Sequence, residues 1–342
     1  MLWEKRRTLT QNEKDRRAAS RDAPALVEDH MKHFALAALL MGTALPAAAD
    51  YTIIAPANPG GGWDQTARTM QTVMQDEGIS PSVQVQNVPG AGGTIGLAQF
   101  ASQNKGNADA LIVGGYVMVG AILTNNSPVS LADVTPIARL TGEYEAVVVP
   151  AASPIETMEQ LTEALKADPG AVSWAGGSAG GTDHIAVGLI AKAAGVDPTK
   201  INYIAYSGGG EALAAILGNQ VTAGISSLGE FQEQVKAGTL RLLAVSAPAR
   251  IDGVDAPTLK EAGLDVELQN WRMVAAAPGL SDEQKAKVAA DIEKLAKSAG
   301  WQEQLTTKGW ADTYLAGAEF DAQLKADITA TEAVLKDIGL VK

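Results

Sequence analysis

A short segment near the middle of the chain has the spacing of a catalytic serine. Gly176-x-Ser178-x-Gly180 follows an apolar run and precedes a helical pattern, as the nucleophile elbow of serine hydrolases does. That mechanism also requires a histidine base from a separate, later loop. His184 lies six residues beyond Ser178, on or beside the same helix, where it is badly placed to act as that base. A serine hydrolase using Ser178 therefore stays only as the alternative hypothesis, and we assign no catalytic residue.

Four glycine clusters indicate a different chemistry. Each follows an apolar or alternating run and precedes a helical pattern, and they occupy residues 58–64, 89–93, 176–181 and 207–210. Glycine lets the backbone approach a ligand closely. The start of the next helix then offers unpaired N–H groups and a partial positive charge. A single cluster is explained well enough by a tight turn. Four together predict a cleft that binds an anion through backbone amides.

Other ligand classes conflict with the residue types present. Residues 90–96 miss the dinucleotide fingerprint because Ile95 occupies the position of its third glycine, and no glycine cluster leads to a Walker-type G-K-[ST]. The 342 residues contain no cysteine, which excludes disulfides, thiolate zinc sites and iron–sulfur clusters. We therefore expect no cofactor and no metal. A formal charge of -12 argues against nucleic acid as a partner.

The elements around these clusters predict an α/β fold. Strand-like runs precede the clusters, and further runs occur at residues 111–114, 146–149, 221–226 and 242–247. Strands that alternate with helices favour largely parallel sheets, which bind ligands beyond the carboxyl ends of their strands. Asp64 is placed to cap the first helix, in which Ala67, Met70, Val73 and Met74 share one face. Two later helical stretches, 281–299 and 318–336, are expected to form a packing region.

The amino-terminal segment predicts export. Residues 31–49 begin with a basic Met-Lys-His, continue with an apolar run of 12 and end in Ala-Ala-Ala after Pro46, as a signal peptide does. The run is too short to span a bilayer. We expect cleavage near Ala49 and a periplasmic mature protein. Residues 1–30 are polar and are interpreted as a non-native upstream extension, with translation starting at Met31; a long, unusual n-region is the alternative.

Cleavage at that position makes the net charge more negative and leaves few candidate residues for acid–base chemistry or ligand binding. Eight basic and six acidic residues lie before residue 50, so the formal charge becomes -14 and His184 becomes the only histidine. A histidine at a helix start is commonly bonded to local backbone. Trp63 fits either the edge of the core or the wall of a cleft. Arg68 is expected on the surface, whereas Arg272 is a candidate anion partner or hinge contact.

Residues 54–64, IAPANPGGGWD, resemble the first ligand loop of the substrate-binding proteins of tripartite tricarboxylate transporters, the Bug family. Other segments fit the layout of that family in the same order: residues 87–93, 177–184 and 206–211, Arg250 with residues 257–261, and residues 338–340. The resemblance covers about residues 50–342. It implies a two-domain type II periplasmic-binding-protein fold that closes like a Venus flytrap on a ligand in an interdomain cleft.

The resemblance also implies a function and a set of binding residues. The protein would capture a small di- or tricarboxylate, citrate-like as first choice, and deliver it as a monomer to the large and small membrane subunits of the transporter. The ligand-binding residues implied are Asn58, Pro59, Gly60, Gly61, Gly62, Trp63, Asp64, Tyr116, Ser178, Gly181, Thr182, His184, Tyr206 and Ser207. Gly114 and Gly115 would also lie near the ligand.

The chain is expected to cross twice between the two domains. We place domain 1 at residues 50–148 plus 273–342 and domain 2 at residues 149–272. The crossings would fall at residues 146–150 and 268–275, and the ligand would shift the protein toward a closed state by binding that state more tightly.

Overall fold

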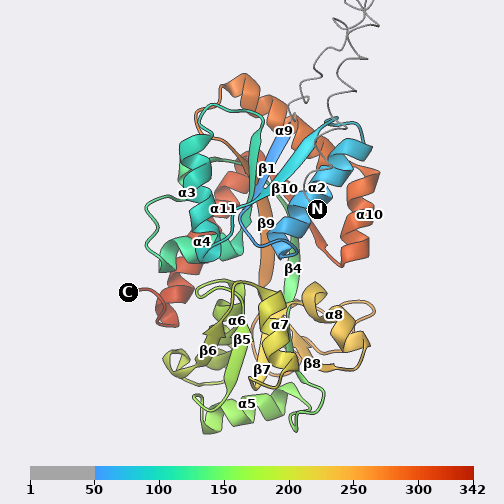
Figure 1. The fold of residues 1–342 in the computed structure, drawn as a ribbon. Helices are drawn as coiled ribbons and strands as arrows, with labels where there is room; N and C mark the ends of the chain where they lie inside the picture. The colour runs from blue at the N-terminus through green and yellow to red at the C-terminus, as the bar shows by residue number, and fades with distance from the viewer. Residues whose placement is uncertain (1–50) are drawn as a thin grey trace, which may run out of the picture. The chain divides into compact units, whose positions relative to one another are not determined.

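The computed structural model describes residues 51–342 (Figure 1). The predicted signal peptide at 31–49 and the predicted extension at 1–30 lie outside the described residues. The strands of the described part of the chain are β1 (Tyr51–Ala55), β2 (Val83–Asn87), β3 (Ala110–Gly115), β4 (Thr135–Pro150), β5 (Ser173–Gly176), β6 (Asn202–Ala205), β7 (Ala223–Ser227), β8 (Leu240–Val245), β9 (Gln269–Ala276) and β10 (Ala311–Ala316). Its helices are α2 (Gly62–Asp76), α3 (Thr94–Gln103), α4 (Tyr116–Thr124), α5 (Met158–Ala167), α6 (Thr182–Ala193), α7 (Gly209–Leu217), α8 (Leu228–Lys236), α9 (Asp282–Lys297), α10 (Ala299–Lys308) and α11 (Gly317–Asp337).

The strands form one connected sheet in the order β2-β1-β3-β9-β4-β7-β5-β6, and β8 and β10 also pair with β4. Pairing is parallel between β1 and its neighbours β2 and β3, and between β5 and its neighbours β6 and β7. Every pair that involves β4 or β9 is antiparallel. The expectation of largely parallel sheets is therefore right for the outer strands and wrong for the centre. The alternation of strands and helices in the sequence indicates the parallel βαβ units. It does not indicate the direction of β4 and β9, which lie between those units.

Strand β4 joins two groups of strands. It pairs with β9 from Thr135 to Tyr144 and with β7 and β8 from Glu145 to Pro150. Figure 1 shows β4 passing from the group around β1 to the group around β5. The change of partners lies close to the crossing predicted at residues 146–150, and β9 occupies the second predicted crossing. The domain boundaries themselves remain a proposal.

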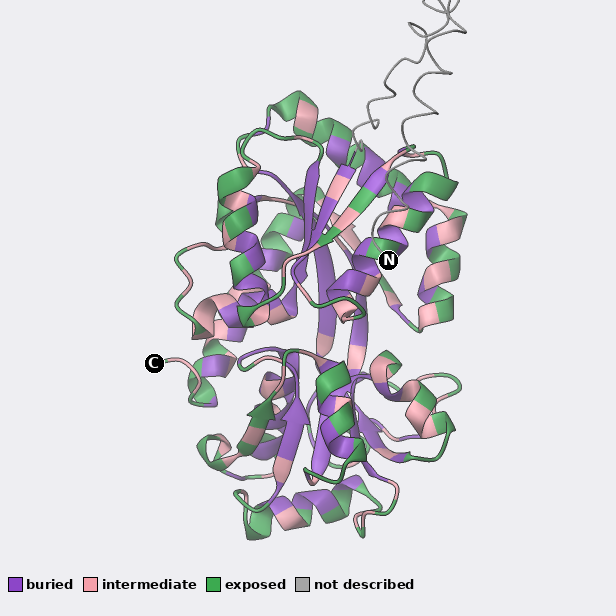
Figure 2. Cartoon of the chain, viewed as in Figure 1, coloured by how far each residue is buried: buried purple, intermediate pink, exposed green. Residues whose placement is uncertain are grey.

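Apolar strands covered on both faces make the core. β1 is buried at four of its five positions, and the α2 side chains Ala67, Met70, Val73 and Met74 are all buried, as their spacing predicts (Figure 2). Trp174, Trp301, Phe100 and Phe231 are among the largest side chains in the interior. Each fully buried side chain of this size contributes roughly 2 kcal/mol through removal of apolar surface from water.

The carboxyl-terminal region contains more elements than its sequence pattern predicts. The first predicted helix is interrupted at Ser298, which ends α9 and caps α10 by accepting a hydrogen bond from the Trp301 N–H at 3.1 Å. Strand β10 follows and pairs with β4, so it owes its conformation to a distant partner. Among the described helices, none is long and apolar enough to cross a membrane.

Candidate functional site

The first predicted ligand loop leads directly into α2. Gly61 is the N-cap of this helix and has no side chain to satisfy the free N–H groups of the first turn. The loop is closed by a hydrogen bond from the Gly61 N–H to the Asn58 carbonyl at 3.0 Å. Gly60 has a φ of 85°, which favours glycine, and is exposed. The loop therefore presents backbone amides at the positive end of a fifteen-residue helix.

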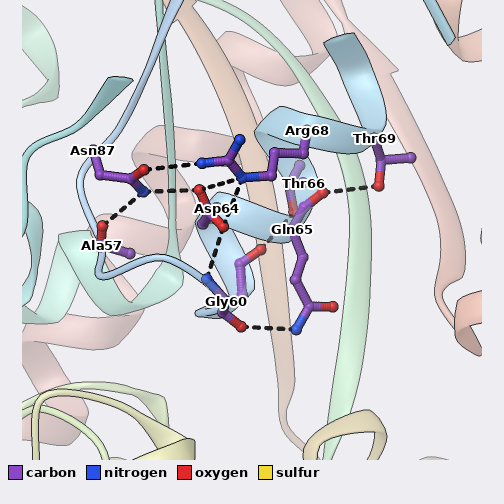
Figure 3. A network of polar contacts seen from close by, with 9 residues as sticks. Ala57, Gly60, Asp64, Gln65, Thr66, Arg68, Thr69 and Asn87 are labelled. Atoms are coloured by element: carbon purple, nitrogen blue, oxygen red, sulfur yellow. Dashed lines mark hydrogen bonds and ion pairs between the residues drawn. The ribbon is translucent and has the colours of Figure 1, made fainter. Parts of the chain in front are cut away.

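Asp64 holds this loop in place through hydrogen bonds (Figure 3). The prediction that Asp64 is the N-cap of the helix is wrong, because that position is occupied by Gly61. Because α2 begins at Gly62, Asp64 is the third helical residue, and its carboxylate reaches back to the Gly60 N–H at 2.7 Å. It also accepts hydrogen bonds from Arg68 Nε at 3.0 Å and Asn87 Nδ2 at 2.8 Å. Burial raises the pKa of Asp64, but these donors outweigh burial and hold it below its usual value. The carboxylate is therefore ionised and engaged within the loop.

Gly62 and Trp63 are held by packing. A Cβ at Gly62 would lie 2.5 Å from Nη2 of Arg272, so the helix start rests directly on that guanidinium. Trp63 is 8% exposed, and a Cβ at Gly93 would lie 2.6 Å from its ring. Of the two interpretations of Trp63, this structure places its ring at the edge of the core. Arg68 is half exposed, as expected, yet it also donates to Asn87 Oδ1 at 3.1 Å.

The second predicted loop has the same construction at the start of α6. Gly181 is an N-cap without a side-chain bond, and its N–H donates to the Ser178 carbonyl at 2.9 Å. The hydroxyl of Thr182 is buried and has no hydrogen-bond partner among the described residues. Two helix starts with glycine caps thus carry the two loops predicted to bind carboxylates.

His184 supports the second loop. Its Nδ1 accepts a hydrogen bond from the Gly180 N–H at 3.2 Å, and its ring stacks on Tyr203 with centroids 4.1 Å apart. Burial lowers the pKa of His184 to about 4, so the imidazole is neutral at ordinary pH. Because Nδ1 is bonded to local backbone, this geometry gives no support to His184 as a base for Ser178.

The 3-10 turn at Ala91–Gly93 and α4 lie between the two loops. A Cβ at Gly92 would lie 3.8 Å from the Ser178 Cβ, while Gly93 packs on the Trp63 ring. A Cβ at Gly181 would lie 3.2 Å from Val117 of α4. Ser178 and Trp63 therefore flank the same pair of glycines, which brings residues from distant parts of the chain to one region.

The remaining predicted residues lie at different depths. Tyr116 is buried against Trp271 with ring centroids 6.2 Å apart. Burial raises the pKa of Tyr116. Tyr206 is half buried and its N–H donates to the Gly176 carbonyl at 2.9 Å. Ser207 is exposed and its N–H donates to Glu211 at 3.1 Å. Assignment of the fourteen predicted residues to ligand contacts stays a prediction.

A polar cavity of about 190 Å³ adjoins the first loop. Most of the residues that line it were not predicted from the sequence as site residues. Arg272 is 3% exposed, forms an ion pair with Glu143 and lies 5.2 Å from the Trp310 ring centroid. The position of Arg272 within the largely apolar strand β9 was the one feature of the sequence that indicated this cavity. The cavity is lined by Gln65, Glu143, Gly229, Glu230, Gln232, Arg272, Thr307, Lys308 and Trp310. These residues come from segments spread over most of the chain, so no local pattern could have grouped them.

Residues 66–340 match the family model described as the tripartite tricarboxylate transporter family receptor. The chain belongs to this family. It is 30% identical to the protein BugT of Bordetella pertussis over 249 residues, which covers 70% of this chain and 75% of BugT. The family consists of solute-binding proteins and not enzymes, which confirms the preference for a binding protein over a hydrolase.

Solved structures confirm the two-domain periplasmic-binding-protein fold of this receptor. The periplasmic binding protein BugD superimposes with a TM-score of 0.76 at 22% identity, covering 85% of this chain and 98% of BugD. MatC of Rhodopseudomonas palustris with bound malate gives a TM-score of 0.66 at 23% identity, covering 84% and 96%. A second R. palustris protein, with adipate, gives 0.76 at 22% identity, covering 84% and 97%.

Proposed function

We propose that this receptor captures a small di- or tricarboxylate between its two domains and delivers it to the membrane subunits of a tripartite transporter. The observation that carries the proposal is the pair of glycine-capped helix starts at α2 and α6, which flank the glycines at 92–93. Each offers backbone N–H groups and the positive end of a helix dipole to one carboxylate. Two such sites match a ligand with two separated carboxylates.

The charge of the chain makes local capture necessary. With residues 1–49 removed the formal charge is -14, so the net field of the protein does not attract an anion. Helix-end amides act over one turn and are independent of net charge. A ligand that touches both loops binds the closed arrangement more tightly than an open one, and so shifts the population toward closure.

The related structures support the ligand class. MatC carries malate and the second R. palustris protein carries adipate, both of which have two carboxylates. A citrate-like acid is our first choice within this class. The proposal includes the fourteen predicted residues as the binding set, domains at 50–148 plus 273–342 and at 149–272, a monomeric state, and a periplasmic location after cleavage near Ala49.

A thermal-shift screen of residues 50–342 tests this function. We expect malate, adipate or citrate at millimolar concentration to raise the melting temperature, because a ligand that binds only the folded state stabilises it by mass action. Gly61→Val should abolish the shift while the protein still folds. Its φ of -69° suits valine, but the added methyl groups would cover the loop amides.

Gly170→Val is the matched control, since Gly170 is exposed in a turn away from both loops and should keep the full shift. If no di- or tricarboxylate raised the melting temperature of the unmodified protein, the proposed function would be wrong. A full shift in Gly61→Val would contradict the assignment of the first loop.

A further inference from the structure

Buried carboxyl groups gather where β4 changes partners. Glu145 is 1% exposed and Asp183, the second residue of α6, is 6% exposed. Ser226 at the end of β7 donates its hydroxyl hydrogen to Glu230 at 2.9 Å. Although Glu230 as a whole is only half buried, its carboxyl end is enclosed. Glu145, Asp183 and Glu230 are called the carboxyl cluster below.

Too few cations face this cluster to neutralise it. The charged and titratable groups around it are Glu143 on β4, Arg272 on β9, Tyr203 on β6 and, at the rim of the adjoining cavity, Lys308 on α10. Arg272 is engaged by Glu143. Lys308 lies 5.4 Å from the Trp310 ring centroid. Within the described residues, none of the three cluster carboxyls forms an ion pair.

The surroundings of Glu145 favour the protonated form of its carboxyl group. Neither of its carboxyl oxygens receives an N–H or O–H from any described residue, and both are buried. After burial, the charge of the Asp183 carboxyl is the largest influence that raises the pKa of Glu145. Two adjacent ionised carboxylates in a buried site are costly, so this pair favours a state in which one of them is protonated. Burial raises the pKa of Asp183 to about 6, that of Glu230 to about 7, and that of Glu145 well above its usual value.

The cluster is joined to the second ligand loop by backbone. Oδ2 of Asp183 accepts the Gly177 N–H at 2.7 Å, and the Tyr203 hydroxyl donates to the Gly177 carbonyl at 2.7 Å. Gly177 is the residue before Ser178, so the hydrogen bond to Asp183 joins the cluster directly to the backbone of the loop. An anion held at the start of α6 would therefore add negative charge beside carboxyls that already lack cations.

We propose that the protein takes up a proton into the carboxyl cluster when it binds a carboxylate ligand. This inference rests on the proposed function. A bound anion disfavours the ionised form of nearby carboxyls, so the cluster holds more protons in the complex than in the free protein. By linkage, protonation and ligand binding strengthen each other equally. Where the ligand is fully ionised, affinity then falls as the pH rises through the range in which the free cluster ionises.

Isothermal titration of residues 50–342 with malate and with adipate tests the inference. Both acids are fully ionised near pH 7, so the ligand itself exchanges few protons. Titrations in phosphate and in Tris, whose ionisation heats differ, give the number of protons taken up. We expect net uptake at pH 7, and an affinity about tenfold weaker per pH unit for each proton bound across the titration range.

Glu230→Gln separates proton linkage from damage to the fold, because glutamine resembles the protonated acid and the Glu230 carboxyl, with a pKa of about 7, is mostly ionised at pH 8. The variant should take up fewer protons and bind more tightly than the unmodified protein at pH 8, a gain that a merely disrupted site would not produce. Glu163→Gln, in an exposed residue of α5, is the matched control and should behave as the unmodified protein does. Binding without buffer dependence in the unmodified protein would contradict the proton uptake alone. If no di- or tricarboxylate, citrate included, gave either binding heat or a thermal shift, the proposed function would be contradicted, and this inference with it.

Discussion

Glycine is required at positions 61 and 62 for two different reasons. At Gly61 the backbone conformation suits any residue and an added Cβ would lie 3.2 Å from the Asn58 carbonyl oxygen, so we propose that glycine serves here to leave the amides of the loop uncovered. At Gly62 a side chain would meet the guanidinium of Arg272, which Glu143 and the Trp310 ring hold in place. The proposed ligand access and the observed packing thus favour the same residue at neighbouring positions. The two requirements can be separated only because the contact with Arg272 is known.

Glu230 should make stability depend on pH. Its pKa lies at about 7 in the folded protein, above the usual value, because of burial and the nearby Asp183 and Glu143. A carboxyl whose pKa is raised by folding favours the folded state when protonated, so stability falls as pH rises from about 4 to about 7. Glu230→Gln should be more stable than the unmodified protein at pH 8, by about 1–3 kcal/mol.

Urea denaturation of the ligand-free protein at pH 5 and pH 8 measures this effect, with Glu163→Gln again as the exposed control. At pH 5 the two proteins should differ little. Equal unfolding free energies at pH 8 would show that the Glu230 carboxyl is not shifted as described.

At the scale of elements, β4 connects the two groups of strands, because it pairs with β9 and β10 along one part and with β7 and β8 along the other. Its apolar end was visible as the run at residues 146–149, whereas residues 135–145 carry polar and charged side chains that hide a strand. Those residues are extended because β9 and β10 pair with them on either side. The same strand places Glu143 and Glu145 next to the ligand loops. A strand stabilised by distant partners leaves a weak local pattern.

The start of helix α9 is determined by residues that are close in the sequence. Ser281 accepts a hydrogen bond from the Gln284 N–H at 3.2 Å, and Gln284 accepts one from the Ser281 N–H at 2.9 Å. Ser281→Ala removes one half of this capping box and should lower the unfolding free energy by about 1 kcal/mol. Ligand affinity should not change, because α9 contributes no predicted binding residue. Urea denaturation and a carboxylate titration on the same variant check both parts. A loss of affinity would connect α9 to the site.

For the whole molecule, the predicted cleavage on export would remove more basic than acidic residues and leave a more acidic receptor. We expect the mature protein to begin at Asp50, because Ala47-Ala48-Ala49 has the form of a signal-peptidase site. Intact-mass measurement of the protein recovered from the periplasm checks this. A mature chain that retains residues 1–30 would show that the upstream segment is part of the protein.

Much of the site could be predicted because glycine clusters and helix starts are local features. The loops at residues 58–64 and 176–184 lead into α2 and α6, as their spacing indicates. The role of Asp64 could not be predicted, because Asn87 and the position of Gly60 decide what its carboxylate contacts. The carboxyl cluster was invisible for a similar reason. Its members lie on β4, α6 and α8 and meet only when β4 pairs with β7.

The sequence by itself indicated the family through its short motifs, and the α/β class and the two glycine-rich loops through periodicity and glycine clusters, since all of these depend on residues close in the chain. Only the tertiary structure decided the antiparallel centre of the sheet, the packing of Gly62 on Arg272 and the cation-poor environment of Glu145. Those features depend on which distant segments become neighbours. Burial then changes the electrostatics of groups that would behave ordinarily in water.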